Sequence, residues 1–129
     1  MEKAIQLSVA MENVPGQLGR LCRVLTQANV NIRGISVSDA ADISTIRLIV
    51  SNPAAAKKAL REAGLGFVTQ EVLVVDLEDK PGALEQLAVR LGEAGVNVNY
   101  VYGTADGGGG HARMVLRVSD VDRARQTLA

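Results

Sequence analysis

A six-residue turn segment occurs twice in the sequence and divides it into two similar halves. The first copy is 13–18 (Asn-Val-Pro-Gly-Gln-Leu) and the second is 79–84 (Asp-Lys-Pro-Gly-Ala-Leu), 66 positions later when Gly82 is set against Gly16. The same offset carries Val30-Asn31-Ile32 onto Val96-Asn97-Val98. A repeat of this kind indicates an internal duplication, so each half is expected to form one supersecondary unit.

Each turn is expected to join a strand to a helix. Asn or Asp at its first position can accept hydrogen bonds from free helix amides, and proline pre-sets the backbone at the helix start. The following glycine leaves the backbone uncovered. Such a helix N-terminus can bind a small anion such as a carboxylate. The alternative is that the turn only caps the helix, because cap chemistry alone selects the same residues.

In the first half, apolar residues alternate with polar ones at Ile5, Leu7, Val9 and Met11, which predicts a strand with one buried face. Helical spacing follows, and Asn29 is a candidate left-handed cap at the helix end. The alternation of the next strand slips at Gly34, which predicts a β-bulge. The expected elements are a strand from Ile5, a helix over 16–28, strands over 31–38 and 43–50, a helix from Asn52-Pro53 to Ala63, and a strand over 67–69.

The second half repeats this order but stops early. We expect a strand over 72–77 that is covered on both faces, helices over 82–94 and 120–128, strands over 96–103 and 113–118, and a hairpin turn over the glycine-rich residues 106–110. Ala129 aligns with Arg61 once the two extra residues of this turn are counted, so the strand over 67–69 has no counterpart.

Strand-helix-strand-strand-helix-strand is the ferredoxin-like plan. The sequence therefore predicts an α+β protein of two ferredoxin-like units packed together, over 3–70 and 71–129, the second lacking its last strand. We expect Leu18, Leu21 and Leu25 of the first unit, and Leu84, Leu87 and Leu91 of the second, to be the most buried positions. The open edge of 71–77 is expected to pair with 67–69 or with a second chain, which favours a homodimer.

Composition excludes several classes of function. Fourteen basic residues balance 14 acidic ones and no basic cluster forms, which argues against a nucleic-acid partner. The single cysteine, Cys22, excludes an internal disulfide, and we expect it in the core. His111 has no second histidine or cysteine beside it, so no metal and no cofactor is expected. No apolar run is long enough to span a bilayer and no signal peptide is visible, which favours a cytoplasmic protein without a membrane partner.

The paired motifs resemble the ACT domain, a small-ligand regulatory module of amino-acid metabolism. The resemblance lies in a strand, then Asx-x-Pro-Gly-x-Leu, then Val-Asn-Ile or Val-Asn-Val about fifteen residues later, and it covers nearly the whole chain twice. In that family amino acids bind between two ACT units, near the turn after the first strand and the start of the second strand. Some relatives carry histidine two residues before the turn asparagine, where this chain has Met11 and Leu77.

Carried over to this sequence, the resemblance implies two matching groups of ligand-binding residues, with Asn31 or Asn97 reaching across from a facing unit. The first group is Met11, Asn13, Val14, Gly16, Gln17, Leu18, Asn31 and Ile32, and the second is Asp79, Gly82, Ala83, Leu84, Asn97 and Val98. A zwitterionic amino acid needs donors for its carboxylate and acceptors for its ammonium, which helix amides and Asn or Asp oxygens supply. Asn31 and Asn97 could instead only cap helix ends or satisfy strand edges.

Three functions remain open at this point. The first is a regulatory protein that binds an amino acid and modulates a partner enzyme of amino-acid metabolism. The second is an interaction module or regulatory subunit of the same fold without a ligand. The third is a small enzyme, which we disfavour because the sequence shows no set of nucleophile, base and orienting residue.

Overall fold

The computed structural model describes residues 1–105 and 110–129, so most of the glycine-rich turn expected over 106–110 lies outside the described residues. The chain forms two compact units. The N-terminal unit is Ile5–Gln70, and the C-terminal unit is Glu71–Ala129 together with Met1–Ala4.

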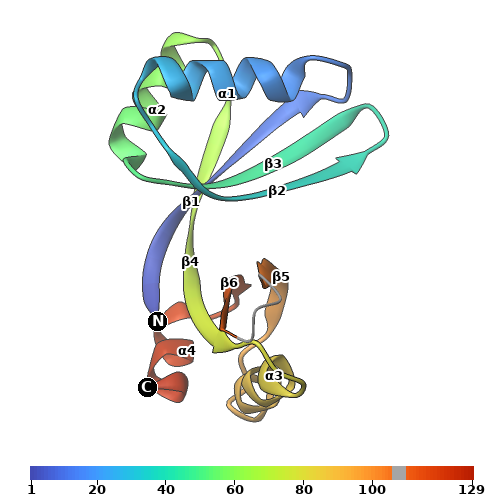
Figure 1. Cartoon of the computed structure of the whole chain (residues 1–129), viewed down its shortest axis with the longest axis vertical. Coiled ribbons are helices and arrows are strands. Elements are labelled where there is room, and N and C mark those ends of the chain that lie inside the picture. The colour runs from blue at the N-terminus through green and yellow to red at the C-terminus, as the bar shows by residue number, and fades with distance from the viewer. Residues whose placement is uncertain (106–109) are drawn as a thin grey trace. The chain divides into compact units, whose positions relative to one another are not determined.

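The N-terminal unit has the ferredoxin-like order of elements. These are β1 (Glu2–Glu12), α1 (Gln17–Gln27), β2 (Ile32–Ala40), β3 (Ile43–Val50), α2 (Pro53–Glu62) and the start of β4 (Phe67–Glu78). Its strands lie in the order β2-β3-β1-β4, and β3 is antiparallel to both β1 and β2. Both helices lie on the same side of these strands (Figure 1).

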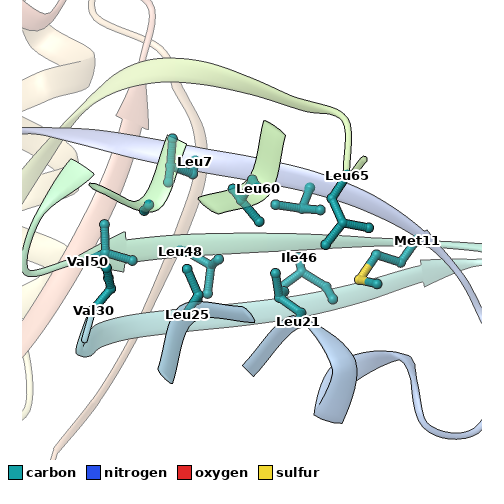
Figure 2. Packing of buried hydrophobic residues seen from close by; sticks show 12 residues of the cluster. Leu7, Met11, Leu21, Leu25, Val30, Ile46, Leu48, Val50, Leu60 and Leu65 are labelled. Carbon is teal, nitrogen blue, oxygen red and sulfur yellow. The ribbon is translucent and has the colours of Figure 1, made fainter. Parts of the chain in front are cut away.

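The core of this unit fills the space between the helices and one face of the sheet. Strand residues with a period of two meet helix residues with a period near 3.6, because those spacings place side chains on one face. Leu21 and Leu25 of α1 lie against Ile46 and Leu48 of β3, and each is at most 2% exposed (Figure 2). Ile46 and Leu48 therefore lie on the buried face of β3, and the strand predicted over 43–50 is confirmed.

The C-terminal unit repeats the plan with β4, α3 (Ala83–Glu93), β5 (Val98–Ala105), β6 (His111–Val118) and α4 (Val121–Leu128). Its β6 is antiparallel to both β4 and β5. Val72 to Val75 are all at most 7% exposed, so the prediction of a strand covered on both faces is confirmed. The α+β, ferredoxin-like fold is also confirmed, and α4 is followed by Ala129 and no further strand.

The first residues of β1 occupy the place of the missing strand in the C-terminal unit. β1 is the hydrogen-bonded neighbour of β4, and its residues Met1–Ala4 belong to this unit. Lys3 Nζ lies 3.7 Å from Glu71 on β4 and 3.1 Å from Asp122 in the first turn of α4. Residues 67–69 continue into β4 itself, so the prediction that they pair with the edge of 71–77 is wrong. The start of β1 lies at that edge instead, so a second chain is not needed there.

Several local predictions are confirmed. The helices predicted from Asn52-Pro53 and from residue 120 start there, and Asn52 and Asp120 cap them by accepting hydrogen bonds from the Ala55 and Arg123 amides. Asn29 adopts the left-handed conformation with φ of 56° after α1. The register of β2 against β3 shifts between Ile32 and Gly34, so the bulge lies where the alternation slips.

Burial of the first helical turn was predicted wrongly. Leu18 is 46% exposed and Leu84 is 42% exposed, whereas Leu21, Leu25, Leu87 and Leu91 are buried. Each exposed leucine is one turn ahead of the buried pair, in the first turn of its helix. Cys22 is half-buried rather than a core residue. None of the helices in the described part of the chain is long and apolar enough to cross a membrane.

Truncation of the buried leucines tests the helix packing. We expect Leu21→Ala and Leu87→Ala each to lower the free energy of unfolding by about 2–5 kcal/mol, because each leaves a cavity. The matched variants Leu18→Ala and Leu84→Ala should cost less than about 1 kcal/mol, because these side chains are already exposed. Urea denaturation measures all four, and equal losses within a helix would contradict the packing described.

Removal of residues 2–4 tests the strand that completes the C-terminal unit. The deletion should expose the edge of β4 and speed amide hydrogen exchange at residues 71–75, since those backbone groups lose their neighbour. Amides shared by β2 and β3 in the N-terminal unit serve as the internal control and should keep their protection. Unchanged exchange along β4 would show that residues 2–4 add nothing to this unit.

Candidate functional site

A left-handed glycine sets the geometry of both Pro-Gly turns. Gly16 and Gly82 have φ of 91° and 88° and occupy the N-cap positions of α1 and α3. A Cβ at Gly16 would meet no atom within 4 Å, so the backbone angle and not crowding requires glycine there. The helices therefore begin one residue after the glycine, with Pro15 and Pro81 outside them.

Asn13 and Asp79 could each accept hydrogen bonds from helix amides, but neither side chain caps its helix. Neither α1 nor α3 has a side-chain hydrogen bond at its N-cap, because three residues separate Asn13 from the first residue of α1. Instead the Asn13 side chain donates from Nδ2 to the carbonyl oxygen of Ala41 at 3.0 Å, and its backbone amide donates to the carbonyl oxygen of Asp42 at 2.7 Å. The turn is thus tied to the tip of the β2–β3 hairpin, and the Asn13 Oδ1 atom can accept from a ligand.

The start of α1 presents backbone donors. The first bond of the helical type runs from the Arg20 amide to the carbonyl oxygen of Gly16, so the amides of Gln17, Leu18 and Gly19 precede it. Gln17 Oε1 is buried and has no hydrogen-bond partner in the described structure. Free amides and the positive end of the helix dipole together favour a carboxylate at this position.

The second turn differs in charge and in its hydrogen bonds. Lys80 Nζ lies 2.8 Å from Glu78 Oε2. The hydrogen bond from Lys80 lowers the pKa of the Glu78 carboxyl, and the charges of Lys80 and His111 act in the same direction. The Ala83 amide donates to the carbonyl oxygen of Lys80 at 3.3 Å, which removes one donor from the helix start. The first turn has Val14 in place of the lysine and therefore no such ion pair.

Asn31 and Asn97 are held by their backbones while their side chains are exposed. The Asn31 amide donates to Ser51 Oγ at 2.9 Å, and the Ser51 amide donates to the Asn31 carbonyl oxygen at 2.9 Å. Asn97 and Ser119 repeat the arrangement with the same distances. Two reciprocal bonds fix each asparagine at the start of its strand and leave its side-chain amide for another partner.

The two groups of polar residues lie at opposite ends of each unit. In the N-terminal unit, Asn13 is next to Asp42 at the start of β3, and Asn31 is next to Ser51 after its end. The eight residues of β3 span about 25 Å, far more than an amino acid. Asn13 and Asn31 of the N-terminal unit are therefore too far apart to hold the same small ligand.

The remaining expected residues surround these positions without adding polar contacts. Met11 is 5% exposed and points into the core with Leu21 and Ile46 (Figure 2), so it supports the turn from beneath. Ile32, Val98 and Ala83 are half-buried. Residues that stand at the turns and strand starts with exposed surface are Asn13, Val14, Gly16, Leu18, Asn31, Gly82, Leu84 and Asn97, and Asp79 is half-buried.

Sequence reasoning missed the residues that hold these positions. The carbonyl groups of Ala41 and Asp42 fasten the first turn, and only the strand order, which brings the end of β1 to the start of β3, shows this. Ser51 and Ser119 could have been found, because both follow a strand and align under the offset of 68 that relates Val50 to Val118. Within residues 1–105 and 110–129 no cluster of three or more metal-binding side chains occurs.

Comparison with solved structures gives many similar chains. Protein BT0572 from Bacteroides thetaiotaomicron is 32% identical, with a TM-score of 0.92 over 98% of this chain and 86% of that one. The regulatory subunit of aspartate kinase from Thermus thermophilus is 12% identical, with a TM-score of 0.69 over 99% and 95%. The aspartokinase alpha and beta subunits give 14% identity and a TM-score of 0.66, over 99% and 95%.

The similarity to the two aspartate kinase structures shows only that they share this fold. A search of curated proteins found no match. A comparison of the sequence with protein families matches residues 3–129 to the ACT domain pair. With two ferredoxin-like units, a Pro-Gly turn before the first helix of each and this match over nearly its whole length, the chain belongs to the ACT domain pair family.

Proposed function

We propose that this protein is a regulatory protein that binds an amino acid between ACT units and thereby modulates a partner enzyme of amino-acid metabolism. The observation that carries the proposal is the pair of half-sites. An open helix start beside Asn13 lies at one end of the unit, and an exposed asparagine lies at the other. Each half-site is incomplete alone, and two units that meet head to tail at these ends supply both.

The half-sites match the two charged groups of an amino acid. The amides of Gln17 and Leu18 can donate to the carboxylate, and Asn13 Oδ1 can accept from the ammonium. Asn31 of a second unit adds a side-chain amide that can donate and accept. Charge-assisted hydrogen bonds of this kind contribute about 1.5–3 kcal/mol each, so the loss of one should weaken binding by about tenfold to a hundredfold.

The first turn is the better site in this proposal. Asn13 can face either end of an amino acid, whereas the carboxylate of Asp79 can attract the ammonium but repels the carboxylate. Glu78 adds a second negative charge beside the second turn, and Lys80 is already paired with it. The helix start there also has one donor fewer, because the Ala83 amide is bonded to Lys80.

Further parts of the proposal concern assembly. Regulatory subunits of aspartate kinase share this fold, which supports a role beside an amino-acid biosynthetic enzyme rather than as an enzyme itself. We assign the two ACT domains to 3–70 and 71–129 and propose that the protein acts as a homodimer. In a dimer, a second chain provides the facing unit that each half-site needs.

Thermal-shift measurement against the twenty amino acids tests ligand binding. A ligand present at 100 times its dissociation constant should add about 2.7 kcal/mol to stability, because it binds only the folded protein. We expect one amino acid, or a few of related shape, to raise the melting temperature, with glycerol at equal concentration as the control. The absence of any shift would favour the interaction module without a ligand.

Calorimetry with the amino acid found in that screen tests the inequality of the turns. Asn13→Ala should weaken binding at least tenfold, about 1.4 kcal/mol, because it removes the acceptor for the ammonium. Asp79→Ala, the matched variant, should cause a smaller loss. The reverse ranking would place the site at the second turn, and equal losses would mean that both turns line one pocket.

A further inference from the structure

The two helices of the N-terminal unit enclose an open groove. α1 and α2 lie on the same side of the sheet (Figure 1), and a hollow of about 320 Å³ lies between them. Its walls are four half-buried apolar residues and two exposed polar ones, in that order Val24, Ala28, Ala59 and Ala63, and Gln27 and Glu62. Because three of the apolar residues are alanine, the helices leave room for side chains from another molecule.

The same two helices carry a strong excess of positive charge. They contain one acidic residue, Glu62, and five basic residues, Arg20, Arg23, Lys57, Lys58 and Arg61. Within residues 1–105 and 110–129, no ion pair involves any of the five. Cations on two helices that are far apart in the chain form no cluster in the sequence, but the fold gathers them on one helix layer. Exposed cations without an acidic partner create a positive potential there.

The helices of the C-terminal unit do not repeat this surface. Together α3 and α4 carry three basic and three acidic residues. The offsets that relate the two halves set Val89 against Arg23 and Gln126 against Lys58. The positive charge is therefore a property of the first unit and not a requirement of its fold.

The chemistry of the groove favours a protein partner over a membrane or a nucleic acid. Membrane-bound helices expose large apolar side chains, whereas Leu18 is the one exposed large apolar residue of α1 and α2 has none. Nucleic-acid binding commonly uses aromatic rings for stacking, and neither helix contains one. An apolar groove flanked by cations matches an amphipathic helix that carries acidic residues beside its apolar face.

We propose that the groove between α1 and α2 is a docking surface for an acidic amphipathic helix of a partner protein. Arg23 and Lys58 each precede a residue of the groove, Val24 and Ala59, and therefore lie about 100° around the helix from it. Both are exposed, so each stands where a carboxylate beside the bound apolar face can reach it. The docking surface rests on the proposed function only in its need for a partner protein, and it does not depend on amino-acid binding.

A designed peptide tests the charge complementarity. The probe is a fluorescent peptide of about 18 residues, with leucines at helical spacing along one face and glutamates on both sides of them. We expect it to bind the full chain with a dissociation constant below about 100 μM, measured by fluorescence anisotropy. A peptide with lysine in place of every glutamate should bind at least about tenfold more weakly. An acidic peptide that does not bind, or equal binding of the two peptides, would overturn the docking surface.

Charge reversal locates the peptide on the helices of the first unit. The double variant Arg23→Glu with Lys58→Glu should weaken binding of the acidic peptide at least about tenfold, because both flanks of the groove then repel it. Arg123→Glu with Arg125→Glu makes the same change of net charge at exposed positions of α4 and should leave the affinity unchanged. Circular dichroism checks that both variants fold. Equal losses in the two would show non-specific attraction and contradict the inference.

Filling the groove gives a second arm that leaves the charge unaltered. Ala59→Gln should weaken binding at least about threefold, because the longer side chain occupies the hollow and glutamine is a good helix former. Ala54→Gln, at an exposed position of the same helix outside the groove, is the matched control and should have no effect. If Ala59→Gln binds as tightly as the unaltered protein, the peptide does not lie in the groove and the inference is wrong.

Two other occupants are distinguished by their own measurements. Binding to vesicles of phosphatidylcholine and phosphatidylserine that the Arg23 and Lys58 double variant loses would assign the surface to a membrane instead. A dimer in sedimentation equilibrium that Ala59→Gln dissociates would assign the groove to a second copy of the chain. Either result would overturn the docking of a partner helix.

Amino-acid binding in the same variants separates this inference from the proposed function. The Arg23 and Lys58 double variant should keep any thermal shift caused by an amino acid, because neither residue belongs to the Pro-Gly turn. Peptide binding without a shift from any amino acid would support the docking surface and refute ligand binding. A shift without peptide binding would refute the docking surface and support ligand binding.

Discussion

Strand β4 needs a hydrogen-bonded strand on each of its two edges, and this requirement determines how the chain is organised. Val72 to Val75 are buried, so their backbone groups must be paired within the protein. β6 pairs with one edge, and β1 is the neighbouring strand on the other. β1 and β4 consequently each contribute residues to both units.

Most of the fold could be predicted from the spacing of apolar residues and from helix-cap residues, because both patterns depend only on residues close together in the chain. Asn52-Pro53 and Asp120 predicted helix starts correctly, since an oxygen three residues ahead of an amide reaches it within one turn. The same logic failed at Asn13, whose partner Ala41 is 28 residues away. It failed for Leu18 as well, because spacing identifies the face of a helix but not whether the sheet extends beneath its first turn. Strand order decides both cases.

The candidate site was predictable as a set of residues but not as an arrangement. The repeated turn and the repeated Val-Asn motif identified Asn13, Asn31 and their counterparts, and each stands on a structured strand or helix end. Their separation by the full length of β3 follows only from the antiparallel register. Under the proposed function, that separation is the reason why a second unit is needed to bring a turn and an asparagine together at one ligand.

The two similar units differ in the charge of their Pro-Gly turns. The turn of the first unit carries no charged side chain, whereas in the second turn Lys80 Nζ lies 2.8 Å from Glu78 Oε2. A carboxylate beside a helix start repels the carboxylate of a zwitterion, and a lysine that is already paired does little to offset it. Under the proposed function, this difference is the reason to expect ligand binding at the first turn rather than at the second.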